Sequence, residues 1–392
     1  MSKNPEYGLP ANDAEIERLA QIDNYCFMLP PEKGVELMNT MGRDTVRVLR
    51  GPSGVEAGLW LVPMGQFFGG RSVPMTGIAA VGVAPEARGH GAARRLMEHT
   101  VRELHDQGIP ISTLYPATTA LYRLVGYEPA GFRYEYELKP KMLTVKERGL
   151  SIRALTEADI PAVKEAQREY ASRHNGCLDR GPYVWKRVFD FRGDRTSGFA
   201  VEEDGRIAGY VYYLQKPAQP FGYSLFITDL MALTPQAGRR LWSFLASHGS
   251  MSHEITWFGG PMDPLLTLLP EQVASIGSSI HWSVRILDAA KAIAARGFAP
   301  GLTLRVELDL TDSLLPANHG RKVLEIADGQ GRLSEGGSGA VHVGINGLAP
   351  LYTGYHAAQG LRDAGLLSGP ASELEKLNAA FAASAPWMRE MF

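Results

Sequence analysis

The spacing of apolar residues changes from that of a strand to that of a helix between residues 78 and 104. Ile78–Val83 is a short apolar run, which suits a mostly buried strand, and Pro85 ends the ladder by removing a backbone donor. After Gly91, apolar residues recur at helical spacing: Ala92, Ala93, Leu96, Val101 and Leu104. The pattern predicts a strand over 78–83 and a helix that begins near Gly91.

Similar patterns continue along the chain and divide it into three segments, 1–148, 149–284 and 285–392. The first segment continues with a strand over 111–115, a short helix over 121–125 and an alternating strand over 132–138. The second opens with a strand at 151, a Thr/Glu capping-box signal and a hairpin turn at Asp204-Gly205. The third predicts an α+β domain, with strands over 302–310 and 340–345 followed by two helical stretches.

The loop between the first strand and helix is rich in Gly and Arg. It reads Arg88-Gly89-His90-Gly91-Ala92-Ala93. Small residues let the backbone approach an anion, and the first N–H groups of a helix have no intrahelical acceptor. A pyrophosphate would satisfy those groups, although an ordinary strand-to-helix turn also uses Gly for its conformational freedom.

The second segment contains an imperfect copy of this junction. The first copy reads PEARGHGAARRL from Pro85, whereas the second reads PQAGRRL from Pro235. The shorter copy lacks the anion-binding loop. We therefore expect cofactor binding and catalysis in the first segment, and a structural or substrate-shaping role for the second.

Composition limits the function classes. The chain has 392 residues, 45% hydrophobic and 21% charged, with a net charge of -2. This balance offers no general attraction to nucleic acid or to an anionic membrane. The start of the sequence lacks the apolar core of a signal peptide, so we expect a cytoplasmic protein without membrane partners. Its two cysteines and ten histidines show no metal-ligand spacing, so no metal is expected.

Arg88, Gly91 and Ala93 fit the acetyl-CoA motif of the GNAT acyltransferases, which follows a strand. Further segments agree with one family: GQFFGGRSVPMTG, ALYRLVGYEPAG, HNGCLDRGPYVW and GLAPLYTGY. The whole chain thus resembles the enhanced intracellular survival (Eis) family. The resemblance implies a mixed α/β architecture of two tandem GNAT folds, the second degenerate, and a C-terminal α+β domain like the sterol carrier proteins.

The resemblance also implies an activity and a set of site residues. Eis-like proteins move an acetyl group from acetyl-CoA to amines, often of aminoglycosides, and often form homo-oligomers such as hexamers. The C-terminal carboxylate of Phe392 would be the base and Tyr122 the acid, with Tyr115 and Tyr127 as rivals by position. The cofactor-binding residues would be Val81, Val83, Arg88, Gly89, Gly91 and Ala92.

The chemistry of amine acetylation explains why such groups are needed. An amine is protonated near pH 7 and must lose a proton before it attacks a thioester, which a carboxylate can accept. Backbone donors and a Tyr proton would stabilise the oxyanion and the leaving thiolate. A tag on the C-terminus would replace the carboxylate by an amide.

The acceptor pocket is predicted from aromatic and acidic residues. Tyr25 and Phe27 are the candidates near the first helix, together with Phe67 and Phe68, and core packing is the alternative. Glu390 is a candidate ammonium partner. Cys26 stands where the family has an acidic residue, which weakens the aminoglycoside interpretation. The remaining alternatives are a protein lysine acceptor and a non-catalytic protein that binds acyl-CoA or an apolar ligand.

Overall fold

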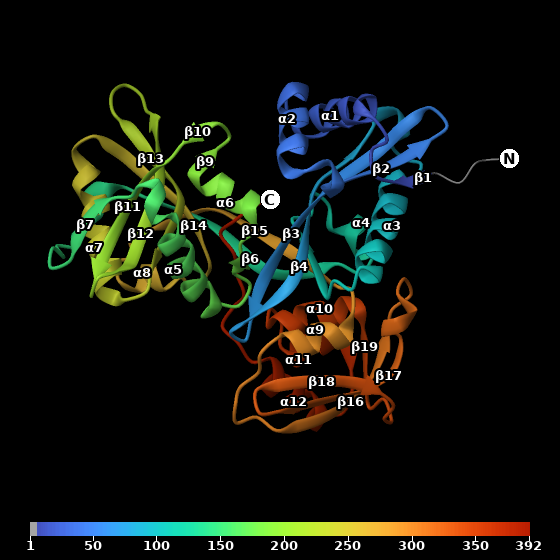
Figure 1. The fold of residues 1–392 in the computed structure, drawn as a ribbon. Coiled ribbons are helices and arrows are strands. Elements are labelled where there is room, and N and C mark those ends of the chain that lie inside the picture. Colours follow the sequence, from blue (N-terminus) through green and yellow to red (C-terminus); the bar gives the residue numbers. More distant parts are fainter. Residues whose placement is uncertain (1–5) are drawn as a thin grey trace.

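The first segment folds as a twisted sheet with helices on both faces (Figure 1). The computed structural model describes residues 6–392. In β3 (Gly54–Phe68), Leu59 and Leu61 pack with α3 (Ala92–Asp106), whereas Trp60 and Val62 pack with α1 (Asp13–Phe27). Alternate residues of a strand point to opposite faces, so the two helices cover opposite sides. The other elements are β1 (Glu6–Gly8), α2 (Pro31–Met41), β2 (Val46–Gly51), β4 (Arg71–Val83), β5 (Ile111–Leu114), α4 (Thr119–Arg123) and β6 (Glu128–Leu138).

The predicted strand and helix of the first junction are both confirmed. The strand predicted over 78–83 is the end of the longer β4, and α3 begins at Ala92, directly after Gly91. The predicted strand over 132–138 lies within β6. These elements follow from the local periodicity of apolar residues, which explains why their positions could be predicted from the sequence.

The second segment repeats this arrangement. Its parallel pair is β13 (Tyr223–Ala232) and β14 (Ser252–Gly259), joined through α7 (Pro235–Ala246), as β4 and β5 are joined through α3. The hairpin turn at Asp204-Gly205 is confirmed, with both residues at positive φ. The further elements are β7 (Ser151–Ala154), α5 (Ile160–Ser172), β8 (Leu178–Asp179), α6 (Pro182–Phe189), β9 (Asp190–Phe191), β10 (Asp194–Arg195), β11 (Ser197–Glu203), β12 (Arg206–Pro217) and α8 (Pro264–Thr267).

One helix cap differs from expectation. The capping box at Thr156 is closed by Asp159, whose carboxylate accepts from the Thr156 N–H at 2.8 Å, and not by Glu157. The box requires an acid three residues after the cap, and Asp159 occupies that place.

The two GNAT-like halves share one continuous sheet because two strands are interleaved. β15 (Ser275–Ile286) comes at the end of the second segment in sequence, yet it lies antiparallel between β5 and β6 of the first. β6 in turn pairs with β14 of the second half. The resulting order is β1-β2-β3-β4-β5-β15-β6-β14-β13-β12-β11-β7. The predicted boundary between 284 and 285 therefore falls inside β15.

The third segment is a separate five-stranded sheet with helices against it (Figure 1). The strand order is β18-β17-β16-β19-β20, built from β16 (Leu304–Thr311), β17 (Gly320–Ala327), β18 (Gln330–Glu335), β19 (Val341–Gly344) and β20 (Leu367–Ser368). Its helices are α9 (Ala289–Ala295), α10 (Ile345–Thr353), α11 (Ala358–Asp363) and α12 (Ala371–Phe381).

Three helices follow β19, where two helical stretches were predicted. α10 is buried from Gly347 to Thr353, so it has no polar face and no helical period to detect. The predicted packing of Leu374, Leu377 and Phe381 is confirmed, because all three are core residues of α12.

Candidate active site

The site is built around the point where β4 and β5 separate. Their parallel pairing ends at Ile78 and Leu114, and β4 continues to Val83 with one edge unpaired. An extra residue in β4 shifts its register against β3, and Ala80 there has φ of 50°. This β-bulge re-aims the backbone next to the separation point.

The unpaired edge of β4 carries backbone donors. Ala84 N–H donates to Glu56 O at 2.8 Å, on the β3 side. Successive amides of a strand point to opposite edges, so the N–H groups of Val83 and Val81 face away from β3. Val81 and Val83 are thus available to a ligand that enters between β4 and β5.

The loop after β4 leaves a row of amides without acceptors. Gly89 and Gly91 have φ of 80° and 76°, a conformation that Gly adopts without strain. No side chain caps α3, and among residues 6–392 no hydrogen-bond acceptor lies within reach of the amides of residues 89–94. Helix N-termini with free amides bind phosphate groups. The loop, with Ala92 as the first helical residue, fits the pyrophosphate of acetyl-CoA.

Two arginines support the loop from its sides. Arg88 Nε donates to Val83 O at 3.3 Å, and its Nη2 lies 3.5 Å from Cys26 Sγ. Arg95, which sequence reasoning missed, donates from Nη1 to His90 O at 2.6 Å. Arg95 could have been identified from its position in the first turn of the predicted helix, because that turn directly follows the loop.

The second half has no such loop. Thr234 caps α7 by accepting from the Ala237 N–H at 3.2 Å, and Pro235 is the first helical residue. A side chain therefore occupies the place where a phosphate would bind in the first half.

Tyr122 differs from its two rivals in the state of its hydroxyl. Tyr115 donates to Glu390 O at 2.7 Å, and Tyr127 donates to Ser112 Oγ at 2.8 Å. The Tyr122 hydroxyl has no hydrogen-bond partner among the described residues, and burial raises its pKa to about 12. Tyr122 packs in the cluster on the α3 face that contains Ile78 and Leu114. Its hydroxyl is protonated at neutral pH and free to donate.

Phe392 reaches the same stretch of β4 from the opposite face. A Cβ placed on Gly77 would lie 2.5 Å from Cε2 of the Phe392 ring, so the ring covers that glycine. The ring also meets Tyr115 edge-on, with 6.0 Å between centroids. Phe392 packs with the cluster of the α1 face. The Phe392 ring is therefore packed against β4 close to the point where β4 leaves β5.

The acceptor candidates divide into surface and core residues. Tyr25 and Phe27, at the end of α1, are 60% and 47% exposed. Phe67 and Phe68 are core residues, so the packing alternative holds for them. Cys26 lies beside the start of the loop after β4, with Sγ 3.6 Å from Val83 O.

Glu390 forms an ion pair with the buried side chain of Arg180. Arg180 donates to its carboxylate, and the Glu390 side chain is 10% exposed. Whether it contacts an acceptor ammonium stays a prediction. Sequence reasoning missed Arg180, and it also missed Asp23, a buried carboxyl group of α1. Neither residue follows from local pattern, because Arg180 pairs with residues distant in sequence and the burial of Asp23 depends on the packing of α1 against β4.

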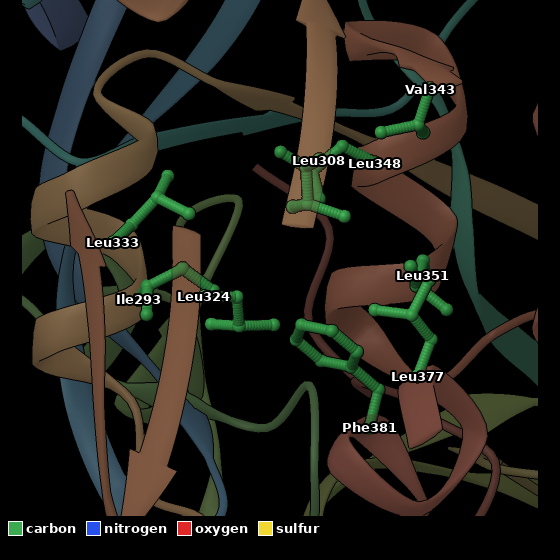
Figure 2. A pocket seen from close by; sticks show the side chains of 9 residues that line it. All are labelled: Ile293, Leu308, Leu324, Leu333, Val343, Leu348, Leu351, Leu377 and Phe381. Carbon is green, nitrogen blue, oxygen red and sulfur yellow. The ribbon is translucent and has the colours of Figure 1, made fainter. Parts of the chain in front are cut away.

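The C-terminal domain contains a small apolar cavity (Figure 2). Its volume is about 10 Å³, room for about one water molecule. It is lined by Ile293, Leu308, Leu324, Leu333, Val343, Leu348, Leu351, Leu377 and Phe381. Over residues 6–392 there is no helix long and apolar enough to cross a membrane, and no group of three potential metal ligands.

Family models match three parts of the chain in the predicted order. Residues 9–130 and 176–286 match two models described as "Acetyltransferase (GNAT) domain", and residues 289–389 match "Sterol carrier protein domain".

Solved and curated relatives cover most of the chain. A GCN5-related N-acetyltransferase from Anabaena variabilis is 34% identical, with a TM-score of 0.95 over 99% of this chain and 100% of its own. One from Kribbella flavida is 29% identical, with a TM-score of 0.85 over 99% of each chain. N-acetyltransferase Eis of Mycobacterium tuberculosis is 27% identical over 80% of this chain and 79% of its own length. The chain belongs to the GCN5-related N-acetyltransferases, enzymes that use acetyl-CoA, and within them to the Eis-like group with two GNAT domains and a C-terminal sterol-carrier-like domain.

Proposed function

We propose that this enzyme transfers an acetyl group from acetyl-CoA to a primary amine of a small cationic acceptor, such as a polyamine or an aminoglycoside. One observation carries the proposal: the terminal residue Phe392 lies against β4 where β4 leaves β5, beside the unpaired edge with its backbone donors. Acetyl-CoA supplies an activated thioester. The phosphate loop at Arg88–Ala92 and the amides of Val81 and Val83 bind and orient it.

The carboxylate of Phe392 binds the ammonium group of the acceptor and accepts its proton. In its ionised form the carboxylate attracts the cationic ammonium group. The ring of Phe392 packs against apolar neighbours such as Met64, and these contacts fix the position of the terminal residue. The exposed aromatic residues Tyr25 and Phe27 form the outer wall of the acceptor site.

Tyr122 donates a proton to the sulfur of the leaving group. The free and protonated state of its hydroxyl supports this role, and so does its position on the face opposite Phe392. Acid and base then act from opposite faces of the sheet, so neither neutralises the other directly. Backbone N–H groups on the β4 edge stabilise the oxyanion.

The test is release of free thiol from acetyl-CoA, measured with untagged protein and a panel of polyamines, aminoglycosides and Lys peptides. We expect turnover with at least one small amine, and a kcat about 100-fold lower in Tyr122→Phe because a general acid is lost. Arg88→Ala is expected to raise the KM for acetyl-CoA, and a short C-terminal extension to remove most activity. Turnover with Lys peptides alone would assign a protein acceptor, and no turnover with any amine would refute the proposal.

A further inference from the structure

The last residues of the chain are fixed to both GNAT domains as far as Glu390. This tail, residues 386–392, makes backbone hydrogen bonds to β6 of the first domain and to the loop before β8 of the second. Each residue from 386 to 390 is held through its backbone, Glu390 by the side chain of Tyr115, which follows β5. The contacts are Phe132 N to Pro386 O at 2.9 Å, Trp387 N to Asn175 O at 2.9 Å, Met388 N to Phe132 O at 3.2 Å, Arg133 Nε to Arg389 O at 2.8 Å, and Tyr115 Oη to Glu390 O at 2.7 Å.

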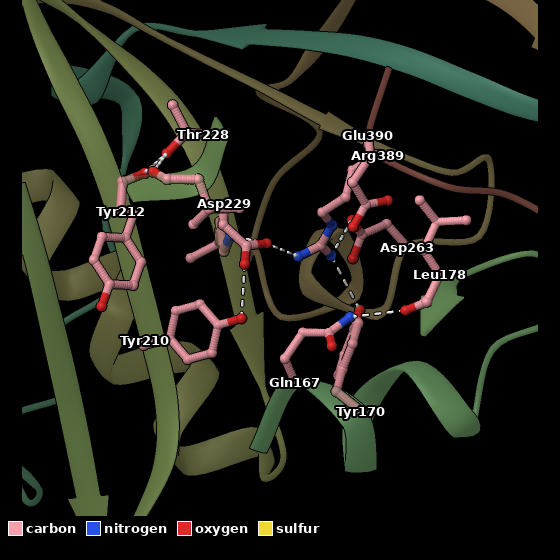
Figure 3. Close-up of polar contacts among 12 residues, drawn as sticks. Gln167, Tyr170, Leu178, Tyr210, Tyr212, Thr228, Asp229, Asp263, Arg389 and Glu390 are labelled. Atoms are coloured by element: carbon pink, nitrogen blue, oxygen red, sulfur yellow. Dashed lines mark hydrogen bonds and ion pairs between the residues drawn. The ribbon is translucent and has the colours of Figure 1, made fainter. Parts of the chain in front are cut away.

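Side chains of the tail enter a buried ionic cluster inside the second domain (Figure 3). Arg180 donates through both terminal nitrogens to Asp229 and through Nε to Glu390 at 2.5 Å. Arg389 of the tail lies 3.4 Å from Asp229 and 3.8 Å from Asp263. The side chains of Arg180 and Asp229 are 2% and 0% exposed.

The charges in this cluster depend on one another. Burial alone would raise the pKa of Asp229, yet Arg180 and Arg389 lower it overall, so the carboxylate stays ionised. Burial likewise opposes the charge of Arg180, but Asp229 and Glu390 raise its pKa well above the usual value. A buried ion that loses a partner is costly, so a tail without Glu390 fits this site poorly.

We propose that Arg180 and Asp229 of the second GNAT domain are positioning residues that fix Glu390 and thereby hold the C-terminal carboxylate at the acceptor amine. These three residues together form the clamp. The proposal rests on the proposed function of Phe392. It gives a definite role to the second half, which has no phosphate loop, because that half holds the base of the first half in place.

Because Glu390 of the clamp is close to the base in sequence, a small shift of Glu390 moves the carboxylate of Phe392. Phe392 lies two residues after Glu390 in the chain. One residue of extended chain spans about 3.5 Å, so a slip of a single residue removes the carboxylate from reach of the amine. A misplacement of about 1 Å can cost about 100-fold in rate.

The experiment compares Glu390→Gln with the wild type by steady-state kinetics and by hydrogen exchange of the C-terminal peptide. Glu103→Gln is the matched control, because Glu103 also pairs with a buried arginine, Arg47, but does not touch the tail. We expect Glu390→Gln to lower kcat 10- to 100-fold with an unchanged KM for acetyl-CoA, and to speed exchange at residues 386–392. The control is expected to keep the wild-type kcat and the protected tail.

Three results would overturn the clamp: an unchanged kcat with a faster-exchanging tail, a lower kcat with a protected tail, or no change in either. If Glu390→Gln fails to fold, Arg180→Lys is used instead. This variant keeps the positive charge but loses the bidentate contact with Asp229. An inactive wild-type protein would refute the proposed function, while the exchange measurement would still test the clamp.

Discussion

Asp23 is a carboxyl group without a hydrogen-bond donor in the part of the chain that the structure describes. It is fully buried in α1, and its Oδ1 would lie 3.2 Å from a Cβ on Gly82 of β4. Burial raises its pKa to about 8, and the nearby Trp60 ring nitrogen lowers it slightly without meeting hydrogen-bond geometry. Asp23 is therefore largely protonated at neutral pH, beside the strand that binds the thioester in the proposed function.

This burial predicts a pH-dependent stability. Between the ordinary value of 3.8 and about 8, the folded chain holds a proton that the unfolded chain has released. The free energy of unfolding therefore falls as pH rises through this window. We expect Asp23→Asn to exceed the wild type in stability at pH 8, by up to a few times the roughly 1.4 kcal/mol of one pKa unit, and by much less at pH 5.

The measurement is denaturant unfolding of wild type and Asp23→Asn at both pH values. Asp106→Asn is the control, since the Asp106 side chain is 78% exposed and its change should leave the pH dependence as it is. An equal pH dependence in wild type and Asp23→Asn would contradict the assignment.

At the scale of elements, the two strand-to-helix junctions share the same order of strand and helix, but only the first contains the phosphate loop of the proposed function. α3 starts with free amides after two left-handed glycines, whereas α7 starts at Pro235 with a Thr cap. The length difference between PEARGHGAARRL and PQAGRRL is visible in the sequence, so this contrast could be predicted. The β-bulge at Ala80 could not, because nothing in the apolar run 78–83 distinguishes a bulged strand from a regular one.

Gly89→Ala tests the loop against an equivalent glycine elsewhere. Gly89 and Gly205 have φ of 80° and 75°, and a Cβ on either would meet no atom within 4 Å. Each substitution should cost about 1 kcal/mol of stability, because Ala is strained at positive φ. We expect only Gly89→Ala to raise the KM for acetyl-CoA, several-fold, with kcat largely kept. Equal KM values for the two variants in a thiol-release assay would argue against phosphate binding by this loop.

At the scale of the whole molecule, the active half is completed by parts from the other two. β15 fills the sheet between β5 and β6, and the tail crosses both GNAT domains before it reaches Gly77. Family resemblance predicted the domain order, which the family models confirm, and a role for Phe392 that stays a prediction. The interleaving of β15 and β6 could not be predicted from local sequence, because strand alternation does not reveal which distant strand is the neighbour. The predicted bounds at 148 and 284 stay a prediction.

Residues 1–148 produced alone are expected to aggregate. Without β15, the inner edges of β5 and β6 are left unpaired, and exposed edges pair with other chains. Co-production of residues 149–392 should restore a soluble complex, which size-exclusion chromatography would detect. A soluble, monomeric fragment 1–148 with a cooperative unfolding transition would contradict this.

The interleaved strand also sets when the enzyme can fold during its synthesis. β5 leaves the ribosome long before β15, which is made only after β7 to β14 of the second segment. While residues 115–274 are made, the nascent chain therefore carries a sheet with an open edge at β5, which is prone to misassembly. Slow translation, premature termination or a shortage of chaperones should thus affect this protein more than one whose domains close their sheets in order.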